Sequence, residues 1–170
     1  TNYDESLALA NAAKNKDWDS VSRLLAHGAD INSKYDYGNT LLYDAALNED
    51  WDSVEKLVAL GADINCQNER KYSPLAYAVR QNQWESVNQL IKLGADINTR
   101  WEYGWTPIFF VVLNEDWEHA KFLKSHGADV NAKADNGITL LANAVRENRW
   151  ESVNELINLG ADINTRCEHG

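Results

Sequence analysis

The chain has 170 residues, of which 44% are hydrophobic and 25% are charged, so it is long enough to form one domain with a substantial apolar core. Its formal net charge of −10 makes nucleic acids and anionic membranes poor candidates as partners, because both attract basic surfaces. No apolar run is long enough to span a bilayer. We therefore expect neither a nucleic-acid partner nor a membrane partner.

A pentapeptide, Gly-Ala-Asp-Ile/Val-Asn, recurs along the whole chain with a spacing of 33 residues. Its copies begin at Gly28, Gly61, Gly94, Gly127 and Gly160. A tryptophan precedes each copy by ten residues, and we call these five residues the ladder tryptophans: Trp18, Trp51, Trp84, Trp117 and Trp150. A fixed period of this length predicts one structural unit stacked many times. Core residues must then recur with the period, whereas exposed positions that vary are free to carry binding.

Each unit is predicted to contain two helices. In the second unit a short helix begins after Thr40, whose hydroxyl can cap its first turn. A second helix runs from near Asp50 to Gly61, because apolar residues between them fall at helical spacing and a glycine readily ends a helix. The residues equivalent to Thr40 in the later units are Ser73, Thr106 and Thr139. Pro74 and Pro107 follow two of these caps, at the first helical position, where proline is well tolerated.

The units divide the chain into five repeats and the start of a sixth. The repeats run at about 1–33, 34–66, 67–99, 100–132 and 133–165, and 166–170 opens the next one. We expect a single domain over 1–170 and an incompletely covered fifth repeat, with open apolar surface around Leu141, Val145 and Leu156. Because the chain contains no methionine, we expect that the true N-terminus is not present. The chain is then a segment of a longer protein or an engineered protein.

The period, the Thr-Pro pair Thr106-Pro107 and the recurring pentapeptide together resemble the ankyrin-repeat family across essentially the whole chain. The resemblance implies an all-α solenoid with short β-hairpin loops. The His of the family's Thr-Pro-Leu-His motif is replaced here, which puts the inter-repeat hydrogen bond of that His in question. The replacements are Tyr43, Ala76, Phe109 and Ala142. The family's glycine between the two helices is also replaced, by Lys16, Glu49, Asn82, Glu115 and Asn148.

No combination of residues indicates catalysis, since no nucleophile–base pair, phosphate loop or metal-ligand cluster is visible. We therefore expect no enzymatic activity, no metal site and no cofactor. His27 and His126 directly precede helix-ending glycines, where a partial positive charge suits the helix dipole. Cys66 and Cys167 lie about three repeats apart and are predicted to be free thiols. We expect a cytoplasmic location, or the host cytosol if the chain is an effector.

The ladder tryptophans allow two interpretations, a stacking platform for bases or glycans and a role in the core. The family usually has Leu-x-Ile-Val where this chain has Trp-x-Ser-Val, so a larger residue is paired with a smaller one. Such a change conserves volume, which cores tolerate. We favour core packing and expect Trp84→Ala to cost ~3–5 kcal/mol, as for a large buried aromatic.

The asparagines that close the pentapeptides also allow two interpretations. Asparagine tolerates turn conformations and bonds to local backbone. In the ankyrin family an asparagine at this position can be a target of asparaginyl hydroxylases, with a leucine eight residues upstream, as Leu57 is to Asn65. We favour the structural interpretation and leave hydroxylation open.

The family resemblance implies that partners bind on the concave face, which is formed by the hairpin tips and the first helices. Aromatic residues and arginine gather at these positions in repeats two to four, and they are the residue types of interface hot spots. The expected partner-binding residues are Tyr37, Asp44, Arg70, Tyr72, Tyr77, Arg80, Tyr103, Trp105, Phe110 and Leu113. Tyr43 and Phe109, at the family's His position, are expected to pack between repeats.

These observations predict a non-catalytic binding module that recognises a protein or peptide partner through its concave, aromatic-rich face. Two alternatives stay open. A small-molecule or glycan receptor would need a deep pocket around Tyr77, Trp105 and Phe110. A structural spacer within a longer ankyrin array would need these aromatic positions to be buried. The fold does not name the partner.

Overall fold

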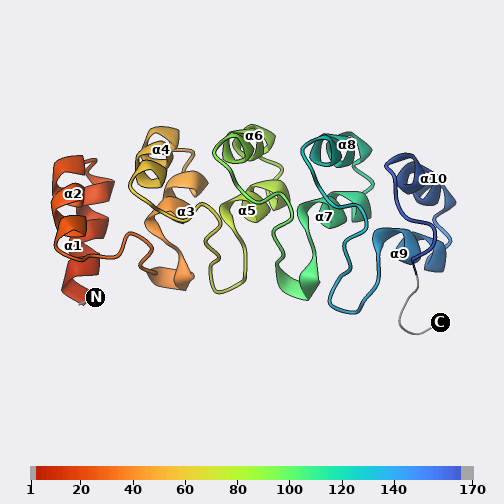
Figure 1. Ribbon diagram of the computed structural model, residues 1–170, viewed down its shortest axis with the longest axis horizontal. Helices are drawn as coiled ribbons and strands as arrows, with labels where there is room; N and C mark the ends of the chain where they lie inside the picture. The colour runs from red at the N-terminus through yellow and green to blue at the C-terminus, as the bar shows by residue number, and fades with distance from the viewer. Residues whose placement is uncertain (1–2, 166–170) are drawn as a thin grey trace.

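The structure, a computed structural model, describes residues 3–165. In this range the chain forms helix pairs stacked side by side into an elongated solenoid (Figure 1). The helices are α1 (Tyr3–Lys14), α2 (Trp18–Ala26), α3 (Leu41–Leu47), α4 (Trp51–Ala59), α5 (Pro74–Arg80), α6 (Trp84–Lys92), α7 (Pro107–Leu113), α8 (Trp117–Ser125), α9 (Leu140–Arg146) and α10 (Trp150–Asn158). The odd-numbered helices form one row and the even-numbered helices form the other (Figure 1). The expected all-α architecture is confirmed.

The first helices of repeats two to five begin directly after the hydroxyl residues that the sequence predicts as their caps. Thr40 accepts a hydrogen bond from the backbone N–H of Tyr43 at 3.2 Å, and Ser73 accepts one from Ala76 at 3.1 Å. Thr106 and Thr139 cap α7 and α9 in the same way. These side chains satisfy backbone N–H groups that have no partner inside the helix.

The second helices start at acidic residues in three repeats. Asp17, Asp50 and Asp116 each accept a hydrogen bond from the backbone N–H three residues further on. Among the described second helices, α6 and α10 begin at Gln83 and Arg149 without a side-chain cap. The aspartates also suit the positive end of the helix dipole.

The turn between the two helices of each repeat adopts a left-handed conformation at the position where the family has glycine. The φ angles of Lys16, Glu49, Asn82, Glu115 and Asn148 lie between 56° and 59°. This region costs Lys16, Glu49 and Glu115 about 1 kcal/mol each, whereas Asn82 and Asn148 tolerate it better because asparagine is enriched there.

The loops between repeats are closed by backbone hydrogen bonds, but the described residues contain no β-strand, only an isolated bridge between Lys133 and Thr139. The loop of repeat two closes through Tyr35 N–H to Asn39 O at 2.8 Å. Its tip contains the 3-10 helix η1 (Asp36–Gly38), and repeat four contains the equivalent η2 (Glu102–Gly104). The expected hairpin loops are therefore tight turns without flanking strands.

Neighbouring loops contact each other through their backbones. Tyr37 O accepts a hydrogen bond from Glu69 N–H at 3.1 Å, and Tyr103 O accepts one from Asp135 N–H at 2.9 Å. A Cβ atom on Gly38 would lie 2.9 Å from the backbone nitrogen of Glu69. Glycine is thus required there, because the next loop leaves no space for a side chain.

The asparagines of the pentapeptide connect successive repeats. Asn65 Oδ1 accepts a hydrogen bond from Asp96 N–H at 2.7 Å, and Asn98 Oδ1 accepts one from Asp129 N–H at 2.8 Å. Asn32 and Asn131 make the same bond to the repeats that follow them. The structural interpretation predicted bonds to local backbone, whereas these bonds reach the next repeat. They repeat with the same period as the sequence.

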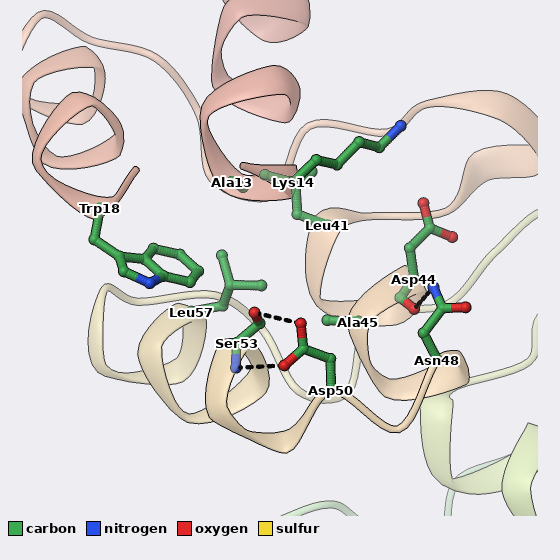
Figure 2. A pocket seen from close by; sticks show the side chains of 10 residues that line it. All are labelled: Ala13, Lys14, Trp18, Leu41, Asp44, Ala45, Asn48, Asp50, Ser53 and Leu57. Carbon is green, nitrogen blue, oxygen red and sulfur yellow. Dashed lines mark hydrogen bonds between the residues drawn. The ribbon is translucent and has the colours of Figure 1, made fainter. Parts of the chain in front are cut away.

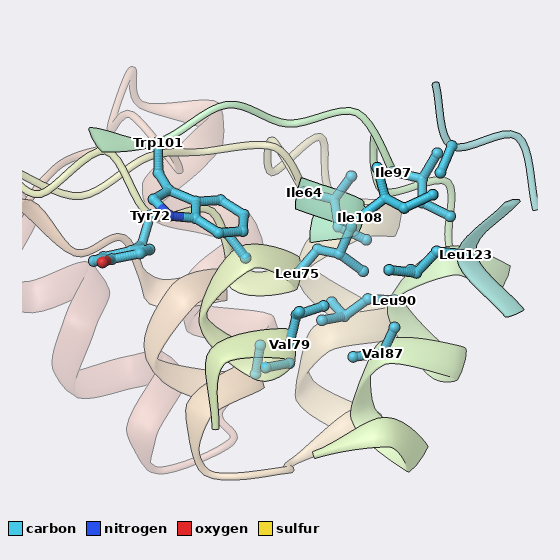
Figure 3. Packing of buried hydrophobic residues seen from close by; sticks show 14 of the residues in the cluster. Ile64, Tyr72, Leu75, Val79, Val87, Leu90, Ile97, Trp101, Ile108 and Leu123 are labelled. Carbon is cyan, nitrogen blue, oxygen red and sulfur yellow. The ribbon is translucent and has the colours of Figure 1, made fainter. Parts of the chain in front are cut away.

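Buried hydrophobic residues from every repeat form one cluster along the stack, and Figure 3 shows the part of it around Leu75 and Leu90. In the middle repeat Leu75 and Leu90 are buried, and Ile108 and Leu123 continue the core in the next one. These residues recur with the 33-residue period, so each repeat contributes to a core that continues into its neighbours.

The ladder tryptophans cover this core rather than lie inside it. Trp18, Trp51, Trp84 and Trp117 pack against the core while part of each ring stays exposed. Trp150 is 59% exposed. The predicted packing against the core is therefore found for Trp18, Trp51, Trp84 and Trp117, but their rings are less buried than predicted because each lies at the start of a second helix.

The fifth repeat exposes more apolar surface than the middle ones. Val145 is 44% exposed and Ile163 is 69% exposed, as predicted for an incompletely covered repeat. Leu141 is half-buried, but Leu156 is fully buried, so the expectation of open surface there is wrong. Leu156 packs inside its own helix pair, and coverage by a further repeat is not needed to bury it.

Candidate binding face

The candidate binding face consists of the loop tips and the first helices α3, α5 and α7. The repeat period places Tyr37, Arg70 and Tyr103 at the same tip position of repeats two, three and four. All three side chains are exposed. The face therefore presents a tyrosine–arginine–tyrosine row along consecutive repeats.

Tyr37 and Tyr103 are held in an unfavourable backbone conformation. Tyr37 is 79% exposed with φ 59°, and Tyr103 is 66% exposed with φ 65°. A left-handed conformation is uncommon for a bulky residue and costs about 1 kcal/mol. Neither ring gains much burial in return, so the fold alone gives no reason for tyrosine at these tips.

A hollow of about 290 Å³ lies between repeats two and three on this face. The side chains around it come from two loops and from the first helices α3 and α5. The lining residues are Tyr37, Asn39, Tyr43, Leu47, Asn68, Arg70, Tyr72, Tyr77, Arg80 and Gln81. Five of the ten residues predicted to bind a partner, Tyr37, Arg70, Tyr72, Tyr77 and Arg80, are thus brought together.

Tyr72 does not have the exposed position that a contact residue needs. Its side chain is buried, with 6% exposure, and its ring lies 5.9 Å from that of Trp101. The Tyr72 hydroxyl accepts a hydrogen bond from Arg80 Nη1, and the guanidinium carbon of Arg80 lies 5.2 Å from the centre of the Tyr72 ring. Tyr72 therefore positions Arg80, and the prediction of direct contact is wrong because its ring packs between repeats.

Tyr43 forms the floor of the hollow. Its ring meets the half-buried Tyr77 edge-on, with centroids 6.3 Å apart, and its hydroxyl accepts a hydrogen bond from Asn68 Nδ2 at 3.1 Å. Burial raises the pKa of the Tyr43 hydroxyl above its usual range, so the group stays neutral. Sequence reasoning missed Asn68, although the period places it in register with Tyr35 and Trp101 and so within reach of the neighbouring loop.

A second aromatic group lies on repeat four. The half-buried Trp105 stacks on the buried Phe109 with centroids 5.8 Å apart, and Tyr103 lies 6.1 Å from Trp105. The half-buried Phe110 meets the buried Trp101 edge-on at 6.2 Å. Leu113, at the end of α7, is also half-buried. These rings are partly supported by the core and partly open to a partner.

Asp44 belongs to a different hollow, of about 200 Å³, between repeats one and two (Figure 2). Its Oδ1 accepts a hydrogen bond from Asn39 Nδ2 at 3.0 Å. Partial burial raises the pKa of the Asp44 carboxyl, against the opposing effect of the Asn39 bond. Asp44 lies on the predicted face but outside the tyrosine–arginine hollow.

The family can now be assigned from the sequence and the fold together. A family model described as ankyrin repeats, in three copies, matches residues 9–101 and again residues 75–167. The chain belongs to the ankyrin-repeat family. No match was found among curated proteins. Ankyrin repeats generally serve as protein-interaction modules and are typically non-catalytic.

The missing histidine of the ankyrin motif is replaced by other contacts, one of which reaches the next repeat. In repeat two, Tyr43 reaches Asn68 of the next loop, and Thr40 Oγ1 lies 3.1 Å from Cys66 Sγ. In repeat four, Phe109 occupies this position and stacks on Trp105. Tyr43 thus packs between repeats, as expected, whereas the stacking partner of Phe109 and the Thr40–Cys66 contact lie within a single repeat.

The remaining candidate sites of the sequence have structural roles or lie outside the described residues. His27 Nδ1 lies 2.7 Å from Arg23 O and His126 Nδ1 lies 2.9 Å from Phe122 O, as predicted for residues near helix ends. Within residues 3–165 no group of three or more metal-ligating side chains is gathered. Cys66 is a buried free thiol, whereas Cys167 lies outside the described residues. No helix in the described part of the chain is long and apolar enough to cross a membrane.

Proposed function

We propose that this chain is a non-catalytic binding module that recognises a protein or peptide partner through the concave face of repeats two to four. The observation that carries the proposal is the pair of exposed tyrosines at strained tip positions, Tyr37 and Tyr103. Residues in sparsely populated backbone conformations cluster at functional sites. Exposed tyrosines and arginines are also the residues that dominate binding energy at protein interfaces.

The face is better suited to a polypeptide than to a small molecule. The hollow beside Tyr77 is lined by residues of repeats two and three alone, so it does not extend to the aromatic residues of repeat four. Trp105 and Phe110 are not among the residues that line this hollow. The aromatic groups are thus spread along the stack, as an extended partner requires.

A role as a spacer is less well supported. It would need the aromatic residues of the concave face to be buried, as Tyr72 is. Tyr37 and Tyr103 are exposed, and Tyr77, Trp105 and Phe110 are half-buried. Exposed, clustered aromatic surface usually has a partner.

Affinity capture with the intact chain tests the proposal. The double variant Tyr37→Asn/Tyr103→Asn removes both rings and places asparagine at positions with positive φ, which asparagine tolerates well. We expect thermal stability to stay the same or rise. We expect the retained partner, identified by mass spectrometry, to bind more than about tenfold more weakly, because hot-spot side chains contribute at least ~2 kcal/mol each.

Two further variants complete the experiment. Trp105→Ala/Phe110→Ala should also weaken partner binding while helicity is kept. Lys92→Ala/Glu155→Ala, on the second helices α6 and α10, should leave it unchanged. A partner that binds both concave-face variants as well as the original chain would show that recognition lies elsewhere.

A further inference from the structure

We propose that the partner inserts an aspartate or glutamate side chain into the hollow between repeats two and three, where Arg70 and Arg80 bind its carboxylate. The inference rests on the proposed function, because it specifies the chemistry of the partner segment that lies on the same face. The partner segment is accordingly an acidic peptide, flexible or part of a folded protein. Its acidic side chain contacts the two arginines, and the same segment contacts the tyrosines that line the hollow.

The charge of the hollow is opposite to that of the chain as a whole. The chain carries 26 acidic and 16 basic residues and has a net charge of −10. Among the described residues that line the hollow, Arg70 and Arg80 carry charge and none is acidic. A site of this sign on an acidic chain attracts a carboxylate locally, while the rest of the surface repels other acidic molecules.

Neither arginine is already paired with an acidic group. Arg100 pairs with Asp135 at 3.6 Å, and Arg149 pairs with Glu147 at 3.1 Å. Within residues 3–165, Arg70 and Arg80 make no such ion pair. Their guanidinium groups are therefore free to accept a carboxylate without losing an existing salt bridge.

Arg80 is held in place by its own repeat. One Nη group donates to the Tyr72 hydroxyl, and the guanidinium lies against the Tyr72 ring at 5.2 Å. A guanidinium has five N–H donors in a fixed planar arrangement, so most of them remain available. An arginine that is fixed before binding loses less conformational entropy when it binds a carboxylate.

The tyrosines limit what else can occupy the hollow. Tyr37, Tyr43 and Tyr77 line the same hollow as the two arginines. Tyrosine side chains contribute strongly to binding at protein interfaces, and a hydrogen bond between a guanidinium and a carboxylate is stronger than one between neutral groups. A carboxylate on a peptide can use the arginines and the tyrosines at once, whereas a free inorganic anion uses the arginines alone.

Two matched libraries of short synthetic peptides test the inference with the intact chain. One library contains aspartate and glutamate, and the other contains asparagine and glutamine at the same positions. Peptides retained by the immobilised protein are counted by mass spectrometry. We expect the acidic library to be retained preferentially, and we expect the preference to fall as salt is raised.

Charge-removing variants locate the binding. Arg70→Gln/Arg80→Gln should weaken the selected acidic peptides by about tenfold or more, as expected when a charged hydrogen-bond partner is removed. The control Lys56→Gln/Lys92→Gln removes the same charge from exposed positions of α4 and α6 and should have little effect. Arg70→Gln alone tests the inference without disturbing Tyr72, because Arg70 lies at a loop tip.

The outcomes separate this inference from the proposed function. If retained peptides lose binding in Tyr37→Asn/Tyr103→Asn but show no preference for acidic residues, the face binds peptides and the carboxylate inference is wrong. Acidic peptides that bind Arg70→Gln/Arg80→Gln at full strength would also overturn it. An acidic preference lost in this variant, and kept in the lysine control, supports it.

Discussion

The indole ring of Trp84 lies flat on the imidazole ring of His119 in the next repeat, with centroids 3.8 Å apart and an interplanar angle of 5°. Phe122 meets the same indole edge-on at 6.1 Å. A ladder tryptophan thus joins two repeats through ring contacts along the row of second helices. Its role is coupling between repeats, with only part of the ring removed from water.

This contact gives a first prediction. Trp84→Ala should lower the free energy of unfolding by about 2 kcal/mol, less than for a fully buried tryptophan, because part of the ring stays exposed to water. A double-mutant cycle with His119→Ala should give a coupling of ~0.5–1.5 kcal/mol for the stacked pair. Urea melts measure both quantities.

Trp150→Ala is the matched control, because Trp150 has the same place in the repeat but is largely exposed. Its effect should be clearly smaller than that of Trp84→Ala. Equal losses for the two variants would mean that the stack on His119 contributes nothing to stability.

The missing cap of α6 gives a second prediction. Gln83 makes no cap bond among the described residues, whereas Asp50 in the same position of repeat two accepts hydrogen bonds from Ser53 N–H and Oγ. Since Ser86 is equivalent to Ser53, its backbone N–H can bond to an aspartate at 83, but Glu49 accepts the Ser86 hydroxyl at 3.4 Å and repels a second carboxylate. Gln83→Asp should therefore stabilise the chain by about 0.5 kcal/mol at neutral pH. Chemical denaturation measures the gain, and Gln83→Ala should show none.

The pH dependence of that gain follows from Asp50. The Ser53 hydroxyl bond is the main cause that lowers the pKa of the Asp50 carboxyl in the folded state. A lowered folded pKa contributes stability above the unfolded pKa of about 3.9 and loses it as pH falls through the folded value. The advantage of Gln83→Asp should disappear in the same acidic range; a gain that persists there would not come from a carboxylate cap.

Much of the stack is predictable from the sequence because its elements are local and periodic. Thr40 and Asp50 identify helix starts through their own side chains, and the position of Tyr43 between repeats follows from the family's motif. The period also places Tyr37 and Tyr103 at loop tips, where both are exposed.

The errors concern side-chain burial and contacts between repeats. Tyr72 has the same register as Trp105, but its ring turns under Arg80 and against Trp101, which the register alone does not reveal. The ladder tryptophans recur with the core period and yet stay partly exposed, since periodicity identifies an interface but not its depth. Local sequence rules also do not predict that the asparagines of the pentapeptides bond to the next repeat.

Those asparagine bonds give a third prediction. Asn98 accepts a hydrogen bond from Asp129 N–H at 2.8 Å and donates one to Gly127 O at 3.2 Å. Asn98→Ala should cost ~1–2 kcal/mol, as two hydrogen bonds across one interface are lost. The unfolding transition should also broaden, because stability in a repeat protein depends on coupling between neighbours.

Asn164→Ala is the matched control in repeat five. Within the described residues the Asn164 side chain makes no bond to a following repeat, so this change should be close to neutral. If both substitutions cost the same, the inter-repeat bonds of Asn98 do not account for its effect.

The uneven burial along the stack gives a fourth prediction. Val145 and Ile163 of repeat five are exposed, whereas Val79 and Ile97, their equivalents in repeat three, are buried. Local opening requires less free energy where fewer apolar contacts are broken. Amide hydrogens of α10 should exchange faster than those of α6 in native-state exchange; equal protection of the two helices would contradict this.

The partly buried Asp44 gives the last prediction. Burial raises the pKa of its carboxyl in the folded state, even though Asn39 donates a hydrogen bond to it. For a raised folded pKa, the stabilising contribution is fully present below the unfolded value of about 3.9 and is lost as pH rises through the folded value. Asp44→Asn keeps an acceptor for Asn39 without the charge, so its melting temperature should exceed that of the original chain at neutral pH. The difference in melting temperature should disappear when pH falls below about 4.

Glu55→Gln removes the same charge from an exposed position of α4 and therefore controls for net charge. A gain of equal size in both variants would assign the effect to overall charge repulsion rather than to the burial of Asp44.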